Sequence, residues 1–136
     1  NTRHGTVDWM PIDLRIQDDF PVTLAAYAQY DVLFVNAISD GMNLVAKEGP
    51  VLNRHDGVLV LSEYAGAYEE LGAFAIGVNP FNIEGQAEAL FRALTMSPEE
   101  RADRAGMLSR VVEENSVEKW VQAQFADIAA KLAAGC

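Results

Sequence analysis

The chain has 136 residues, of which half are hydrophobic, and it carries a formal net charge of −10. This length is enough for one domain with a core of its own, and the apolar content excludes a disordered chain. The acidic balance argues against nucleic acids and anionic membranes as partners, because both demand a basic surface.

The first predicted elements lead into a loop with one aromatic residue. Residues 10–16 alternate between apolar and polar side chains, which predicts a strand. A loop follows, and Pro21 then stands in the first turn of a helix expected over residues 23–30. Because loops at the carboxyl ends of parallel strands share one crevice, we expect Phe20 of this loop to lie near Asp40. From the residues alone, the simplest role for Phe20 is an apolar plug beneath the loop.

The central stretch is DVLFVNAISDGMNLVAKEGP, residues 31–50. Residues 32–35 form an unbroken apolar run, typical of a parallel strand buried on both faces. A glycine turn follows, and we expect a helix to start near Met42 and to be broken by Gly49 and Pro50. A helix that begins at the carboxyl end of a strand offers free N–H groups and a positive dipole end. This stretch therefore predicts an anion site.

Two carboxylates frame the predicted anion site. Asp40 precedes the helix, and an ionised acceptor binds polyol hydroxyls strongly. Glu48 lies four residues beyond Leu44, roughly 6 Å along the helix axis, and can reach the next polar group. The order polyol, anion, hydroxyl fits a sugar diphosphate joined to a ribose. The simpler alternatives are a helix cap for Asp40, a solvated acid for Glu48 and a surface cation for Lys47.

The rest of the chain alternates strands and helices and then ends in two long helices. Together with the earlier elements, this pattern predicts a Rossmann-like α/β fold with a parallel sheet of about four strands flanked by helices. The later elements are strands at residues 58–61 and 73–78, a short helix at 67–71, and helices capped by Asn82, Ser97 and Ser116. The last helix carries an apolar stripe at Val117, Trp120, Val121, Phe125, Ile128 and Leu132.

Several chemistries find no support in the sequence. His4 and His55 are far apart and have no ligand-spaced partners, so we expect no metal site. No phosphate-binding P-loop and no nucleophile elbow are present, and we expect no cofactor. Cys136 is the sole cysteine and fits a reducing compartment. Without a signal peptide or an apolar run of membrane-spanning length, we expect a soluble, cytoplasmic protein that does not bind membranes.

Three segments carry a family resemblance: DGMNLVAKE, GVLVLSEYAGAYEELG and VNPFNIEGQAEALFRALTM. Together they resemble the C-terminal domain of trehalose-6-phosphate synthases, which are retaining glycosyltransferases of the GT-B fold. The likeness runs from about Gly5 to about Gln124, although Ser39 stands where many members carry arginine. It implies that residues 1–136 are one partial nucleotide-sugar-binding domain. It also implies glucosyl transfer from UDP- or GDP-glucose to glucose-6-phosphate, giving trehalose-6-phosphate.

The resemblance also assigns roles to residues. It implies that Asp40 holds the donor glucose and is the catalytic candidate, and that Phe20 touches the nucleobase. The remaining donor contacts that it implies are Gly41, Met42 and Asn43 at the sugar, the Leu44 and Val45 N–H groups at the diphosphate, and Glu48 at the ribose.

The acceptor and the bases that neutralise the diphosphate are implied to lie in an N-terminal domain. Because Asn1 is not an initiator methionine, we interpret the chain as part of a longer enzyme and expect it to be inactive alone. Exposure of the last helix would favour a homo-oligomer. Two alternatives remain open: a related glycosyltransferase with another acceptor, such as glycerol phosphate or a pseudo-sugar, and a non-catalytic nucleotide-sugar-binding module.

Overall fold

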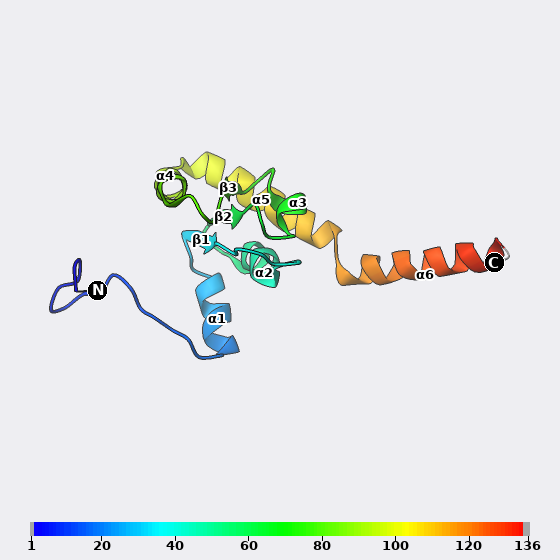
Figure 1. Cartoon of the computed structure of the whole chain (residues 1–136), viewed down its shortest axis with the longest axis horizontal. Helices are drawn as coiled ribbons and strands as arrows, with labels where there is room; N and C mark the ends of the chain where they lie inside the picture. The colour runs from blue at the N-terminus through cyan, green and yellow to red at the C-terminus, as the bar shows by residue number, and fades with distance from the viewer. Residues whose placement is uncertain (1, 135–136) are drawn as a thin grey trace.

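The computed structural model describes residues 2–134, which form a parallel sheet with helices on both faces (Figure 1). Three strands make up this sheet, in the order β1-β2-β3. The elements are α1 (Phe20–Tyr27), β1 (Val32–Val35), α2 (Leu44–Leu52), β2 (Val58–Ser62), α3 (Tyr68–Leu71), β3 (Ile76–Val78), α4 (Ile83–Leu94), α5 (Pro98–Glu114) and α6 (Val117–Ala133). Asn1 and Cys136, which entered the predictions above, lie outside the described residues.

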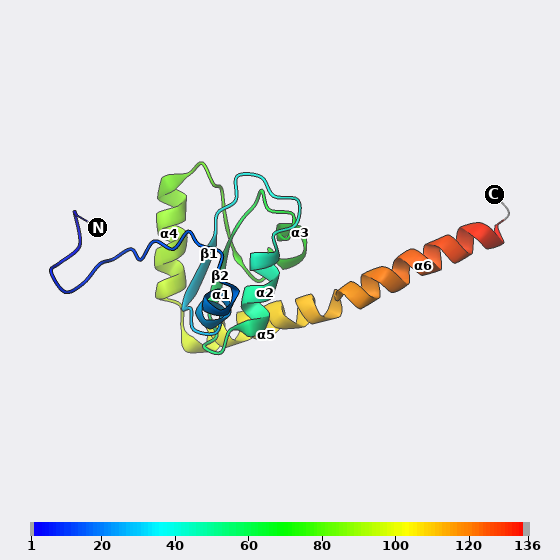
Figure 2. The same ribbon diagram turned by 90° about the horizontal axis from the view of Figure 1, so that it is seen from below.

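The core lies on both faces of the central strand β2, all of whose residues are buried. On one face Leu59 and Leu61 pack with Leu108 of α5 and with α2. On the other face Val58 and Val60 pack against small residues of α4. Figure 2 shows α4 on one side of the sheet and α2 with α5 on the other. Burial on both faces explains why the apolar run of β2 lacks alternation. The prediction that residues 32–35 are buried on both faces is wrong, because β1 lies at the edge of the sheet and Phe34 is 37% exposed. The predicted parallel α/β class is confirmed.

The predicted first strand is wrong, and the described sheet has three strands rather than four. Residues 10–16 form no strand, and Leu14 and Ile16 are 77% and 86% exposed. In Figure 1 this N-terminal segment runs away from the body of the molecule. An alternating pattern prepares one apolar face, but it does not determine whether the segment joins a sheet. The described sheet consists of β1, β2 and β3 and does not include residues 10–16.

Helix α1 begins three residues earlier than predicted. The Asp19 carboxylate caps it by accepting the Val22 N–H at 3.2 Å, and Pro21 stands in its first turn. The cap therefore places the start of the helix at Phe20.

Helix α2 continues through Gly49 and Pro50, so the prediction that these residues break it is wrong. Both are buried, and a Cβ on Gly49 would clash with the Leu33 side chain of β1. Glycine thus allows α2 to approach the sheet closely. Packing at this contact outweighs the backbone hydrogen bond that Pro50 cannot donate.

The three predicted caps of the last helices are confirmed. Asn82, Ser97 and Ser116 accept N–H groups of their helices at 3.0, 3.2 and 3.4 Å. Helix α5 packs on the sheet, whereas α6 projects from the body and buries none of its residues (Figure 1). Within residues 2–134, no helix is long and apolar enough to cross a membrane.

Candidate functional site

The loop between β1 and α2 carries Asp40 at the carboxyl edge of the sheet. Asp40 forms an isolated parallel bridge with Ala65 of the loop after β2. The Asp40 N–H donates to the Tyr64 carbonyl at 3.3 Å, and its carbonyl accepts the Gly66 N–H at 2.8 Å. The two loops are therefore joined as if the β1-β2 ladder resumed beyond the strand ends.

The Asp40 carboxylate organises the start of α2. Its Oδ1 accepts the Met42 N–H and its Oδ2 accepts the Asn43 side-chain amide, both at 3.0 Å. Asn43, and not Asp40, is the N-cap, because its Oδ1 accepts the Ala46 N–H at 3.0 Å. Asp40 is half-buried, and each carboxylate oxygen keeps a second lone pair. The carboxylate can therefore still accept hydroxyl groups while its orientation is held.

Helix α2 begins at Leu44 rather than near Met42. Asn43 has a φ of 76°, which reverses the chain just before the helix. Both Met42 backbone groups are used within the protein, the N–H by Asp40 and the carbonyl by the Ala67 N–H at 2.8 Å. By contrast, the Leu44 and Val45 N–H groups have no protein acceptor in the part of the chain that the structure describes. These two amides are the ones that remain to bind an anion.

The site is open to solvent. Met42, Leu44 and Val45 are 53%, 59% and 40% exposed, although all three have apolar side chains. A Cβ added to Gly41 would meet nothing within 4 Å. The loop thus leaves room for a ligand above Gly41 and the first turn of α2.

Lys47 and Glu48 on α2 have different surroundings. The Lys47 Nζ contacts both Glu70 oxygens at 2.8 and 2.9 Å, and its side chain is only 18% exposed. The interpretation of Lys47 as a simple surface cation is therefore wrong. Glu48 is exposed. Burial of the Tyr27 phenol raises the pKa of that group, and the negative charge of Glu48 adds to this shift as a lesser cause. The Glu48 carboxylate thus lies near α1 and is available to a solvent-side ligand.

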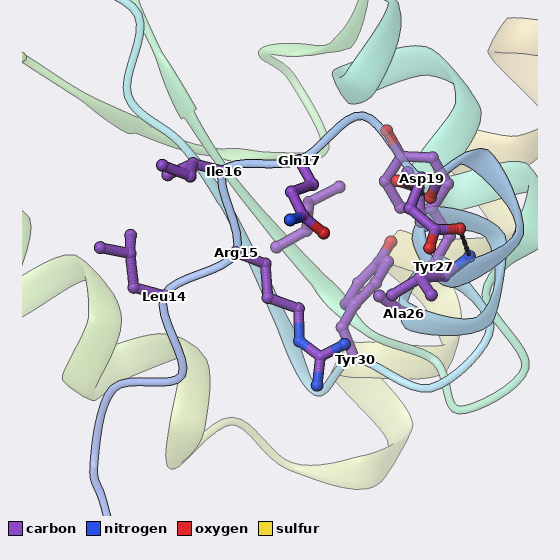
Figure 3. Close-up of a pocket in the computed structure, with 11 residues that line it drawn as sticks. Leu14, Arg15, Ile16, Gln17, Asp19, Ala26, Tyr27 and Tyr30 are labelled. Carbon is purple, nitrogen blue, oxygen red and sulfur yellow. Dashed lines mark hydrogen bonds between the residues drawn. The ribbon is translucent and has the colours of Figure 1, made fainter.

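Phe20 is 62% exposed at the start of α1, which rules out the alternative of an apolar plug. A cleft of about 530 Å³ lies between residues 14–17 and α1, with Tyr27 and Tyr30 on its wall (Figure 3). Neither Phe20 nor any of the predicted donor contacts lines this cleft. The Tyr30 hydroxyl is buried without a hydrogen-bond partner, and burial, with the Tyr27 phenol as a lesser cause, raises its pKa. This cleft is therefore separate from the predicted donor site.

No group of three or more His, Cys, Asp or Glu side chains in residues 2–134 is placed to hold a metal ion. The loop after β2 was given no role from the sequence, although it lies against the loop that carries Asp40. The signal was present in the small residues Ala65, Gly66 and Ala67, which permit a close approach of backbones.

The fold and the site define a class of protein. A parallel sheet flanked by helices, with an open helix N-terminus at its carboxyl edge and a long last helix, matches the C-terminal half of a GT-B glycosyltransferase. The model of Glycosyltransferase family 20 matches residues 1–130, and the chain belongs to this family.

Known relatives support this assignment. The chain is 40% identical over 123 residues to validamine 7-phosphate valienyltransferase of Streptomyces hygroscopicus subsp. jinggangensis. The aligned residues make up 89% of this chain and 25% of that relative. The trehalose-phosphate synthase structure from Burkholderia xenovorans in complex with glucose-6-phosphate aligns with a TM-score of 0.87 and 40% identity, over 95% of this chain and 29% of that one. An E. coli structure with bound UDP-2-fluoro glucose aligns with a TM-score of 0.86 and 38% identity, over 93% and 29%. The chain thus spans less than a third of the length of these relatives.

Proposed function

We propose that this chain is the donor-binding part of a retaining glycosyltransferase that transfers glucose from UDP-glucose to glucose-6-phosphate, giving trehalose-6-phosphate. The observation that carries the proposal is the pair of unpartnered amides, Leu44 and Val45 N–H, beside the oriented Asp40 carboxylate. Family membership supports it, as do similar structures with bound UDP-2-fluoro glucose and glucose-6-phosphate.

In the proposed reaction the bond between the anomeric carbon and the diphosphate oxygen breaks, a bond to an acceptor hydroxyl oxygen forms, and the hydroxyl proton passes to the released diphosphate. Asp40 orients the glucosyl hydroxyls, and Gly41 leaves space beside them. The Leu44 and Val45 N–H groups stabilise the negative charge that grows on the leaving diphosphate, an interaction that strengthens in the transition state. Glu48 accepts a ribose hydroxyl, and Phe20 contacts the nucleobase. The acceptor site and the basic side chains lie in the part of the protein outside this chain.

A second candidate is transfer to a pseudo-sugar phosphate. The 40% identity to validamine 7-phosphate valienyltransferase favours it, because that similarity covers most of this chain. The donor-side residues described above serve either acceptor equally well. The choice between the two therefore depends on the acceptor domain.

Calorimetric titration of the complete polypeptide with UDP-glucose, GDP-glucose and free UDP tests the donor. We expect binding of UDP-glucose and UDP, and weaker binding of GDP-glucose. The absence of binding by every nucleotide sugar would overturn the proposal. Product assays with glucose-6-phosphate and validamine 7-phosphate then separate the two acceptors. The isolated 136 residues should form no product, because the acceptor site lies outside them.

A further inference from the structure

The segment from Ser62 to Glu70, which we call the clasp, holds the loop before α2 and the first turn of this helix. Its contacts are made by backbone groups in the middle and by side chains at the two ends. They are Ser62 Oγ–H to the Ala37 carbonyl at 2.6 Å, Asp40 N–H to the Tyr64 carbonyl at 3.3 Å, Gly66 N–H to the Asp40 carbonyl at 2.8 Å, Ala67 N–H to the Met42 carbonyl at 2.8 Å, and Lys47 Nζ to Glu70 Oε1 at 2.8 Å.

Gly66 sets how closely the clasp approaches the loop. A Cβ on Gly66 would collide with the Gly41 carbonyl group, and backbone atoms cannot turn aside as a flexible side chain can. The space that a Gly41 side chain would occupy is open, since a Cβ there would meet nothing within 4 Å. The loop is therefore in close contact with the clasp at the Gly41 carbonyl and open at the Cβ position of Gly41.

The position of the clasp is passed on to the site through a short chain of hydrogen bonds. The clasp fixes the Asp40 backbone at both its N–H and its carbonyl. The Asp40 carboxylate then holds Asn43, and Asn43 in turn caps α2 through the Ala46 N–H. A displacement at Gly66 would thus move the carboxylate and the free amides of α2 together.

The far end of the clasp fixes the first turn of α2 independently. Glu70 binds Lys47 through both carboxylate oxygens, and its Oε2 also accepts the Asn115 side-chain amide at 3.5 Å. This contact ties α2 to α3 and to the C-terminal end of α5. The ion pair is partly shielded from solvent, since the Lys47 side chain is 18% exposed.

We propose that Gly66 is a positioning residue for donor binding, acting through the Gly41 carbonyl and the Asp40 backbone, with Glu70 in a supporting role. This inference rests on the proposed function, in which Asp40 and the α2 amides hold the nucleotide sugar. Gly66 itself touches no substrate. Its effect should therefore appear in donor affinity and leave acceptor affinity unchanged.

The test is Gly66→Ala in the complete polypeptide, with Gly106→Ala on α5 as the matched control, because a Cβ on Gly106 meets nothing within 4 Å. Titration with UDP-glucose, well below the unfolding temperature, should show donor Kd raised by about tenfold or more in Gly66→Ala, since small displacements of binding groups are costly. Gly106→Ala should bind as the wild type does. The KM for glucose-6-phosphate should stay unchanged in both variants. A purely stabilising role would lower Tm but leave donor affinity intact, and that result would overturn the proposal.

Two further measurements keep the proposal testable. If Gly66→Ala fails to fold, Glu70→Gln takes its place, with an expected increase of about threefold in donor Kd; an unchanged Kd would contradict the positioning role. If the wild type binds no nucleotide sugar, the proposed function fails by itself. Hydrogen exchange without ligand then tests whether the clasp holds the start of α2. If it does, the variant should exchange the Ala46 amide faster than the wild type does, relative to the amides of β2. Equal exchange in wild type and variant would refute the clasp as well.

Discussion

The loop before α2 and helix α6 differ in how the rest of the chain supports them. In the loop, Asp40 and Asn43 are half-buried polar residues whose side chains hydrogen-bond within the chain, as do both backbone groups of Asp40. Helix α6 is capped and regular, yet it buries no residue and presents Trp120, Phe125 and Leu132 at 64%, 68% and 73% exposure. The polar segment is held in place, whereas the apolar one has no buried residue.

This contrast separates local structure from tertiary support. Helix α6 forms because its cap and its helical periodicity suffice, but periodicity does not supply a surface to cover the stripe. The loop has no regular pattern, and its shape comes from the clasp across the sheet edge. We therefore expect the loop to carry binding function already within this chain, whereas α6 can contribute only where another surface covers it.

The largest expected effect comes from Asp40→Ala in the complete polypeptide. The substitution removes the proposed hexose contact together with two hydrogen bonds that order the α2 N-terminus. We expect kcat/KM for the donor to fall by about 10² to 10³. Steady-state assays measure it, with Asp103→Ala on the exposed face of α5 as control. Near-normal turnover would remove Asp40 from the site and weaken the contrast with α6.

A pair of substitutions at Asn43 tests how the loop is held. Asn43→Ala loses the N-cap and the short polar side chain that allows asparagine to adopt a φ of 76°, so we expect a loss of about 2 kcal/mol in the free energy of unfolding. Asn43→Gly accepts this φ and should cost only about 0.5 kcal/mol. Urea unfolding of both variants measures the difference. Equal losses would mean that the backbone conformation of the loop is not constrained as the structure describes.

Tyr30→Phe probes a buried polar group that the described chain leaves unsatisfied. Removing the unpartnered hydroxyl should raise the free energy of unfolding by about 1 kcal/mol. Burial raises the pKa of the Tyr30 phenol in the folded state, so the folded chain holds the phenol proton more tightly than the unfolded chain does. The contribution of this difference to the free energy of unfolding is complete below the ordinary pKa near 10 and is lost as the pH rises above it. Stability of the wild type should therefore fall more steeply above pH 10 than that of the variant.

Urea unfolding at pH 8 and at pH 10.5 measures both effects. Tyr64→Phe serves as the control, since Tyr64 is 49% exposed and should change stability by less than about 0.5 kcal/mol. A less stable Tyr30→Phe would show that the hydroxyl has a partner in solution.

The smallest effect is expected for Phe125→Glu on α6. Because Phe125 is exposed, the free energy of unfolding of the isolated chain should change by less than about 0.5 kcal/mol. If the exposed stripe drives self-association, sedimentation should show less association for the variant than for the wild type. A large loss of stability would mean that α6 packs against the body in solution, and the contrast with the loop would disappear.

Features that depend on neighbouring residues were predicted correctly, and features that depend on residues distant in the sequence were not. The strands at Val32 and Val58 and the caps at Asn82, Ser97 and Ser116 were predictable, because each depends on a few neighbouring residues. The prediction of a strand at residues 10–16 was wrong, because alternation within a segment does not determine whether that segment joins a sheet. The open amides of α2 were expected correctly as a feature, although the helix starts two residues later than predicted.

The sequence by itself determined the parallel α/β class, the caps of the last three helices, and the family, because buried runs, caps and motifs are properties of short segments. Only the tertiary structure decided that Gly66 closes on the Gly41 carbonyl and that Lys47 pairs with Glu70. The same holds for Gly49 and Pro50, which remain helical inside α2. These features join residues from separate strands and helices, and their geometry exists only once the sheet has brought those elements together.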